Sequence, residues 1–302
     1  MRLFSCALAG LTTLSLVGSA ASAAVIHFDD FTSDSLAGST YNTSNSRLRP
    51  THAAASAGVP ALTGPGNTVT AVNGRIARVA GTNGSALTLD ASIGTFADAP
   101  GYSVSAFFRS NVSATGGNRG QMGGVGLSNL DNGFWSDATI TPTAHSGFEV
   151  LVVGGNNTDV VDLRIRNIST GTIAGTTSAT TATIQNQLWY EVKLDVTRNL
   201  DGTFDADAVL IQYDAGESGE RAGWYNPTTL ITVSADGLTN ANIDATTNLF
   251  AGLGLRRNVV SSADLTGFGA ADNFSVNSIP EPMALSVVAL SGMLMLRRRS
   301  RA

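Results

Sequence analysis

Cysteine and lysine are nearly absent from this sequence of 302 residues, which contains one of each, Cys6 and Lys193. Because Cys6 lies close to the N-terminus, the rest of the chain can form neither a disulfide nor a thiolate metal site. Charged residues make up 14% of the chain, against about 25% in ordinary globular domains, which excludes a long charged helix or coiled coil. Acidic residues outnumber basic residues by 23 to 18, and this balance argues against nucleic acid as a partner.

Glycine and apolar side chains are abundant instead. The sequence has 33 glycines, and 43% of its residues are hydrophobic. That is enough apolar material for a hydrophobic core, so a wholly disordered chain is disfavoured. No repeat of fixed period and no long linker divides the chain, which indicates one large domain between the two ends.

The N-terminus has the three parts of a secretory signal peptide. Met1-Arg2 supplies a positive start, residues 3–17 are apolar apart from Ser and Thr, and Ala21 and Ala23 form an A-x-A cleavage site. The apolar stretch is shorter than the ~20 residues of a transmembrane helix. Residues 1–23 are therefore predicted to be a leader that signal peptidase removes before Ala24.

The C-terminus combines a proline-flanked acid, an apolar segment and a basic cluster. Residues 283–296 carry no charge, and as a helix they would span about 21 Å, less than the ~30 Å hydrocarbon core of a bilayer. The flanking motif and cluster are Pro280, Glu281, Pro282, Arg297, Arg298, Arg299 and Arg301. By the positive-inside rule the arginines stay in the cytoplasm and the Pro-Glu-Pro triplet lies outside.

These three parts, in this order, resemble the PEP-CTERM sorting signal of Gram-negative bacteria, and residues 278–302 carry the resemblance. It implies that an exosortase-type membrane enzyme removes the tail. The protein would be tethered transiently to the inner membrane and would then pass to the cell surface or the extracellular matrix. A permanent tail anchor is the alternative.

The remaining residues, 24–277, carry a net charge of -9, since the two ends hold five of the basic residues and one acidic residue. Alternation with period two is the main local signal in this region. In 189–197, for example, Tyr190 and Val192 fall on one face while Glu191 and Lys193 fall on the other. Strands are predicted at 25–31, 75–79, 86–89, 102–108, 147–153, 161–166, 189–197, 204–213, 230–233, 249–255 and 271–276.

Short strands separated by glycine, asparagine and aspartate predict an all-β, antiparallel two-sheet β-sandwich for residues 24–277. Asp201-Gly202 is typical of a tight hairpin turn. The segments Phe-Asp-Asp-Phe at 28–31, Trp-Tyr-Glu-Val-Lys-Leu at 189–194 and Ala-Asp-Asn-Phe-Ser-Val at 271–276 resemble the concanavalin-A-like lectin/glucanase jelly rolls. The resemblance implies that the first and last strands pair.

Enzymatic motifs are weak. Glycoside hydrolases use two carboxylates about 5 to 9 Å apart, but no glutamate here lies in the Glu-x-Asp-x-x-Glu pattern of laminarinase-like jelly rolls. Glu191 and Asp195 share a strand face that is predicted to be solvated, and Gly116-Gly117 and Gly123-Gly124 are predicted to be loops. A polysaccharide lyase would need a base and a positive group, and no motif orders the candidates His145, Gln121, Arg109, Arg164 and Tyr190.

Two kinds of binding site have candidates. A structural calcium ion prefers clustered oxygen ligands, and Asp29, Asp30, Asp272 and Asn273 would converge if the first and last strands pair. No other cofactor is expected. Exposed aromatic rings can stack on sugars, and loop-like sequence surrounds Trp135, Trp224 and Tyr225.

The sequence therefore predicts an exported, surface-sorted protein with a noncatalytic structural or weak glycan-binding role. Extracellular polysaccharide would be its partner, after signal peptidase and the exosortase-type enzyme have acted on it. The alternative is a glycan-active enzyme, a hydrolase or a lyase, on the same scaffold.

Overall fold

The alternating segments of the sequence are extended strands in the computed structural model of the chain. The structure describes residues 23–29, 31, 41, 51–52, 76–77, 84–111, 118–131, 145–156, 160–185, 188–213, 227–261 and 264–280. Regular structure in these ranges consists of strands alone. The first seven are β1 (Val25–Asp29), β2 (Thr51–His52), β3 (Ile76–Ala77), β4 (Gly84–Thr88), β5 (Gly101–Asn111), β6 (Asn118–Ser128) and β7 (Gly147–Asn156). The others are β8 (Val160–Ser169), β9 (Thr172–Thr183), β10 (Trp189–Arg198), β11 (Phe204–Gln212), β12 (Thr228–Leu238), β13 (Phe250–Ser261) and β14 (Asp264–Ile279).

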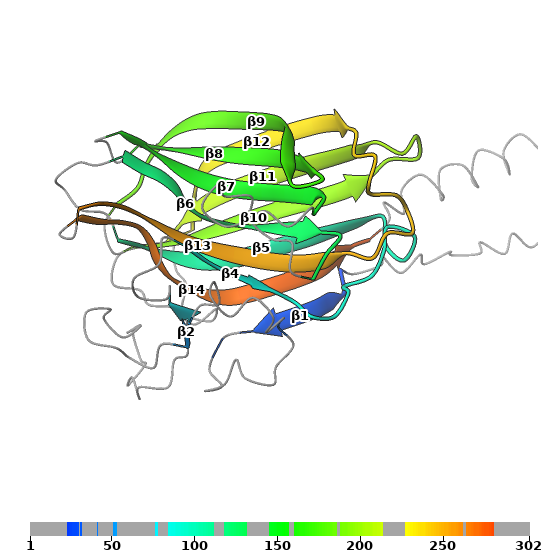
Figure 1. Cartoon of the computed structure of the whole chain (residues 1–302), viewed down its shortest axis with the longest axis horizontal. Coiled ribbons are helices and arrows are strands. Elements are labelled where there is room, and N and C mark those ends of the chain that lie inside the picture. Colours follow the sequence, from blue (N-terminus) through cyan, green and yellow to red (C-terminus); the bar gives the residue numbers. More distant parts are fainter. Residues whose placement is uncertain are drawn as a thin grey trace, which may run out of the picture. The chain divides into compact units, whose positions relative to one another are not determined.

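The strands form two antiparallel layers (Figure 1). The first layer has the order β12-β11-β10-β5-β14, with β1 and β3 beside β14 and β2 on β3. The second has the order β4-β13-β6-β7-β8-β9. The β13–β14 hairpin belongs to both layers and joins them. The predicted all-β, two-sheet antiparallel sandwich is confirmed.

Alternation along the strands sends one set of side chains into the space between the layers. Val192, Leu194 and Val196 of β10 are fully buried there, as are Val150 and Val152 of β7. Full burial of such a side chain contributes about 1.5–3 kcal/mol, so the long alternating strands supply most of the stabilisation.

Aromatic rings add contacts across the layers. Phe148 of β7 packs on Phe204 of β11 with ring centroids 5.0 Å apart, and the centroid of Phe96 lies 5.2 Å from that of Phe204. Tilted rings at these separations interact favourably beyond the area that they bury. The two layers are therefore held together by a cluster of tilted rings at the start of β11 as well as by aliphatic packing.

The first and last strands pair, as predicted. Asp29 of β1 lies opposite Phe274 of β14, and at the other end of the pair the Ser278 amide donates to the Ala24 carbonyl oxygen at 2.9 Å. The Ala24 amide in turn lies 3.2 Å from the Ser278 hydroxyl oxygen. Strand β14 continues to Ile279, two residues beyond the boundary expected from the sequence.

The predicted hairpin at Asp201-Gly202 joins β10 to β11. Gly202 has a φ of +88°, which glycine adopts without steric cost. The Asn199 amide donates to the Thr203 carbonyl oxygen at 2.8 Å, and the Asp201 carboxylate accepts from the Thr203 amide at 3.0 Å. The pairing from Arg198–Phe204 to Tyr190–Gln212 follows from this turn.

Two long strands lie where the sequence showed no clear alternation. One is β9, rich in threonine, and the other is β6, which contains Gly123 and Gly124. The prediction that Gly123-Gly124 is a loop was therefore wrong. A Cβ atom on Gly124 would lie 1.9 Å from the carbonyl oxygen of Val150, so glycine is needed because a neighbouring backbone approaches closely.

The two predicted processing signals lie almost wholly outside the described residues. Of the leader 1–23, the structure describes Ala23, and of the tail 278–302 it describes residues 278–280. The predicted apolar helix 283–296 is not among them. Within the part of the chain that the structure describes, no helix has the length and hydropathy to cross a membrane.

Gly124 provides a direct test of the β6–β7 contact. Gly124→Ala should lower the free energy of unfolding by about 1–3 kcal/mol, the usual cost of overpacking, because the Val150 backbone blocks the methyl group. Urea denaturation measures this. The matched control is Gly175→Ala in β9, where no atom lies within 4 Å of the added Cβ. Equal stability of the two variants would contradict the close approach of the Val150 backbone to Gly124.

Candidate functional site

The second layer presents a face of unusual composition on the side away from the hydrophobic core, which we call the polar face. One row of residues crosses all six strands of this layer on that face. In strand order it consists of Thr88, Gly252, Gly126, Glu149, Arg166 and Thr176. The next row consists of Ala86, Gly254, Gly124, Leu151, Arg164 and Ser178. Glycine therefore occupies β13 and β6 in the middle of the polar face, and the ionisable side chains lie on β7 and β8.

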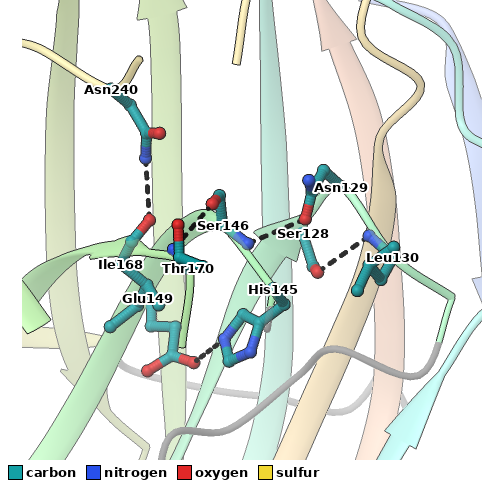
Figure 2. A network of polar contacts seen from close by, with 9 residues as sticks. All are labelled: Ser128, Asn129, Leu130, His145, Ser146, Glu149, Ile168, Thr170 and Asn240. Atoms are coloured by element: carbon teal, nitrogen blue, oxygen red, sulfur yellow. Dashed lines mark hydrogen bonds and ion pairs between the residues drawn. The ribbon is translucent and has the colours of Figure 1, made fainter. Parts of the chain in front are cut away.

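Glu149 is the fully buried carboxylate of the polar face, and the imidazole of His145 contacts it. His145 Nε2 lies 3.3 Å from Glu149 Oε1, and both residues are 1% exposed (Figure 2). Arg166 of β8 lies directly opposite Glu149 in register and is also buried. Opposite residues of antiparallel strands have Cβ atoms about 5 Å apart, so the side chains of Glu149 and Arg166 start from neighbouring positions on the polar face.

Hydrogen bonds between loops hold His145 at the start of β7 (Figure 2). The Asn129 carboxamide oxygen accepts from the Ser146 amide at 2.7 Å, and the Ser146 hydroxyl accepts from the Thr170 amide at 2.9 Å. The His145 carbonyl oxygen accepts from the Gly171 amide at 2.6 Å. The β6–β7 and β8–β9 connections are thereby linked at the residues that bring His145 to Glu149.

A pair of buried asparagines links this region to the first layer. Asn240, which follows β12, donates from Nδ2 to Asn167 Oδ1 and to the Ile168 carbonyl oxygen, both at 2.8 Å. Asn167 in turn donates to the Thr239 carbonyl oxygen at 2.9 Å. Buried amides of this kind need such partners, so the network sets the position of β8 relative to the end of β12.

The accessible part of the polar face lies over β8 and β9. Arg164 and Asp162 form an ion pair of 2.7 Å and are 35% and 24% exposed. Thr176 and Ser178 on the neighbouring edge strand are exposed. Guanidinium, carboxylate and hydroxyl groups at a surface can exchange hydrogen bonds with a polyhydroxylated ligand.

The residues considered for a lyase are not brought together. The Tyr190 side chain is buried in the core, where its hydroxyl accepts from the Gln185 amide at 2.6 Å. Arg109 belongs to β5 in the first layer, whereas Gln121 belongs to β6 and, like His145 and Arg164, to the second layer. The five candidates are therefore divided between the core and the two layers.

Glu191 and Asp195, which share a face of β10, each have a protein partner. Glu191 Oε2 accepts from the Tyr213 hydroxyl at 2.9 Å, and Asp195 Oδ2 lies 2.8 Å from Lys193 Nζ. These pairs lie on the outer side of the first layer. Both acids act there as ordinary surface partners of strand residues, as the sequence predicted.

Asp29 lies on β1, and Asp272 and Asn273 lie on β14. These two strands pair, but the register places the side chains of Asp29 and Asp272 on opposite faces of the layer. Asp29 lies opposite Phe274, whose ring is in the core, while Asp272 lies opposite Phe107, which faces the other side of the layer. Asp30 lies outside the described residues. Asn273 is buried with a φ of +48° at an irregularity in β14.

Protein donors occupy both carboxylate oxygens of Asp29. Oδ1 accepts from the Phe31 amide at 2.7 Å and Oδ2 from the Tyr41 hydroxyl at 2.8 Å. His27 lies beside Tyr41, and burial lowers the pKa of its imidazole, against the opposing charge of Asp29. Among the described residues, no three His, Cys, Asp or Glu side chains are grouped closely enough to hold a metal ion. Calcium binding stays a prediction.

The aromatic candidates Trp135, Trp224 and Tyr225 lie outside the described residues, as does the sorting motif beyond Pro280. The described tryptophan is Trp189, which is 3% exposed and packs with Phe107 and Tyr213. A stack with a sugar ring at the predicted positions therefore also stays a prediction.

Several solved structures are similar to this chain. The chain is similar to the PL-14 alginate lyase of Aplysia kurodai, with 9% identity over 84% of this chain and 99% of that chain and a TM-score of 0.44. It is similar to the endo-1,3-beta-glucanase of Streptomyces sioyaensis, with 13% identity, coverage of 87% and 100%, and a TM-score of 0.41. The Ca²⁺/Man3GlcNAc-bound exoplasmic/lumenal domain of VIP36 matches with 8% identity, coverage of 72% and 88%, and a TM-score of 0.38.

No family model matches the chain, and no curated protein matches it. At the identities and TM-scores of the structural matches, the likeness assigns no ligand, metal or reaction to this chain.

Sequence reasoning missed the Glu149 site. The alternation of Phe148, Val150 and Val152 does place Glu149 on the face away from the core. Strand register places Arg166 opposite Glu149, and no local pattern shows register. A glutamate on the face away from the core is usually exposed to solvent. The one available signal was a second alternating strand with arginines at its polar positions, 164 and 166.

Removal of the Glu149 carboxylate should be costly. Glu149→Ala removes the carboxylate that lies 3.3 Å from His145 Nε2 at a fully buried position, and a buried polar group left without its partner costs about 1–3 kcal/mol. The matched control is Asp162→Ala, which removes the acid of the half-exposed pair with Arg164 and should cost about 0–1 kcal/mol. Guanidinium chloride denaturation followed by circular dichroism gives both values. A Glu149→Ala variant as stable as Asp162→Ala would show that the site is not a stabilising network.

Proposed function

We propose that this chain is an exported protein that a cleavable C-terminal signal delivers to the cell surface or the extracellular matrix. Its sandwich has a noncatalytic role there, structural or through weak binding of glycans. Export depends on the leader 1–23, and sorting depends on Pro280, Glu281 and Pro282 with the following apolar segment and arginines.

The observation that carries this proposal is where the fold starts and stops. Ala23–Pro280 is one compact unit. The hydrogen-bonded pair of Ala24 and Ser278 lies at its margin. The predicted leader cleavage and the Pro-Glu-Pro triplet thus flank the sandwich on both sides. Removal of the leader and of the residues beyond the triplet would leave every strand intact.

The polar face supports a glycan-binding role. Its accessible part offers Arg164, Asp162, Thr176 and Ser178 as hydrogen-bonding groups on two neighbouring strands. The net charge of -9 on residues 24–277 would repel an anionic polysaccharide, so a neutral glycan is the ligand class that fits.

A glycan-active enzyme is the second candidate, and the contact between Glu149 and His145 favours it. A carboxylate and an imidazole 3.3 Å apart, opposite an arginine, are groups that acid–base catalysis uses. Both residues are 1% exposed, so a substrate has no access to them in this structure. This burial makes binding without turnover the better supported function.

Processing of the two ends tests the sorting proposal. Mass spectrometry of the protein from cells that export it should find Ala24 at the N-terminus and no residues beyond the Pro-Glu-Pro region. Neutral replacements of Arg297, Arg298, Arg299 and Arg301 should impair retention and tail removal, because the positive cluster stops the segment at the cytoplasmic side. An intact C-terminus in the mature protein would support the permanent tail anchor instead.

Glycan binding can be measured by affinity electrophoresis of the full chain in gels that contain neutral polysaccharides, chosen with a glycan array. Arg164→Ala should weaken binding about tenfold, because a hydrogen bond to a charged group contributes about 1.5–3 kcal/mol. The matched control is Lys193→Ala, which breaks a similarly exposed ion pair on the other layer. Equal mobility of the two variants would remove the polar face from the proposal, and release of reducing sugar would favour the enzyme.

A further inference from the structure

Five large hydrophobic side chains are exposed in the described part of the chain, and four of them lie toward one end of the sandwich. Val25, Ile26 and Phe28 of β1 are 63%, 40% and 40% exposed. Ile173, after the β8–β9 turn, is 45% exposed, and Leu200 at the tip of the β10–β11 turn is completely exposed. Single exposed hydrophobic residues need no explanation, whereas a group of them at one place does.

Register places the first-layer members at one end of the sandwich. Thr197 at the end of β10 lies opposite Gly101 at the start of β5, and Gly101 lies opposite Ile279 at the end of β14. Ser278 pairs with Ala24, directly before β1. The start of β1, the end of β14 and the turn that carries Leu200 therefore lie at the same end (Figure 1).

The second layer brings Ile173 to that end as well. Ile173 lies opposite Ile168, next to Asn167, which donates to the Thr239 carbonyl oxygen. Thr239 follows Leu238, which lies opposite Phe204 at the start of β11, just after the turn of Leu200. We call the end defined by Val25, Ile26, Ile173 and Leu200 the apolar end.

The chain leaves the sandwich at the apolar end. Pro280 is the residue after β14, and the predicted apolar segment starts at Met283. Three residues span at most about 10–11 Å. If the tail is anchored in a membrane, as the proposed function requires, the apolar end is held within a few residues of the lipid surface.

We propose that the apolar end rests on the lipid–water interface of the membrane while the tail is anchored, with Val25, Ile26 and Leu200 in contact with lipid. This inference rests on the proposed sorting of the chain through its tail. Aliphatic side chains on turns and strand ends can enter the boundary between headgroups and acyl chains, where their burial is favourable. The tether supplies the high local concentration that makes so small a contact effective.

Acidic turns at the same end make the contact reversible. Asp98, Asp201 and Asp244 lie in the connections at this end and are fully exposed. Hydrogen bonds from threonine lower the pKa of each carboxyl. The three therefore stay charged at neutral pH and are repelled by anionic lipid. Once the tail is cut, the sandwich should leave the surface.

A membrane fits the apolar end better than a second copy of the chain does. The exposed side chains come from β1 and from two separate turns, and the acids lie among them. A twofold dimer needs one continuous self-complementary patch. A lipid surface can accept separate apolar points and leave the charges in water.

Two labelled variants of the full chain test the proposal, in a background where Cys6→Ser removes the native cysteine. L200C places an environment-sensitive fluorophore at the apolar end. T229C places the same fluorophore on an exposed residue near the start of β12, about 30 Å along that strand from Leu238. Each protein is reconstituted into phosphatidylcholine vesicles that contain a spin-labelled lipid as quencher, and flotation measures vesicle binding.

The fluorophore at position 200 should shift to the blue and should be quenched several-fold more than the fluorophore at position 229. If the two fluorophores show equal emission and equal quenching in protein that floats with the vesicles, the inference is overturned, while the proposed tethering still holds. Failure of the full chain to float would contradict the proposed tethering, and the inference would fall with it. A blue shift at position 200 that grows with protein concentration and needs no vesicles would mean that a second copy covers this end, which also overturns the inference.

Discussion

The antiparallel pairing of β14 is the interaction on which the rest of the structure depends. This strand pairs with β5 on one side and with β1, β3 and β13 along the other. It therefore connects the two ends of the chain, and through the β13 hairpin it joins both layers. Pairing between residues so far apart in sequence has a large entropic cost, which the buried alternating strands must offset. The irregularity at Asn273 is the place where β14 accommodates several partners.

The same strand alternation that builds the core also creates the polar face. Each strand of the second layer has one set of side chains in the core and another set on the opposite side, where glycines and charged residues lie in rows. Burial of Glu149 with His145 and Arg166 has a desolvation cost, which mutual attraction offsets when the geometry is good. The buried contact of Glu149 with His145 and the accessible ion pair of Arg164 with Asp162 thus lie on the same face of the second layer.

Local patterns predicted the strands that alternate clearly, and they failed where composition hid the pattern. Strands β5, β8 and β10 follow from branched and aromatic residues at every second position. Glycine in β6 and threonine in β9 carry little hydrophobic contrast, so neither segment showed a period. The pairing of β1 with β14 was expected, but it did not unite the calcium candidates, because Asp29 and Asp272 lie in register with residues of opposite faces.

The sequence by itself determined the class of fold, because alternation and turn chemistry are local properties. The composition of the two ends is local as well, and it predicts the processing signals. Tertiary structure alone decided which residues meet. The row from Thr88 to Thr176 and the gathering of Val25, Ile173 and Leu200 at one end both result from pairing between distant strands. A period of two says which side chains share a face. It cannot say which strand lies alongside, which face is covered, or where the ends of the strands come together.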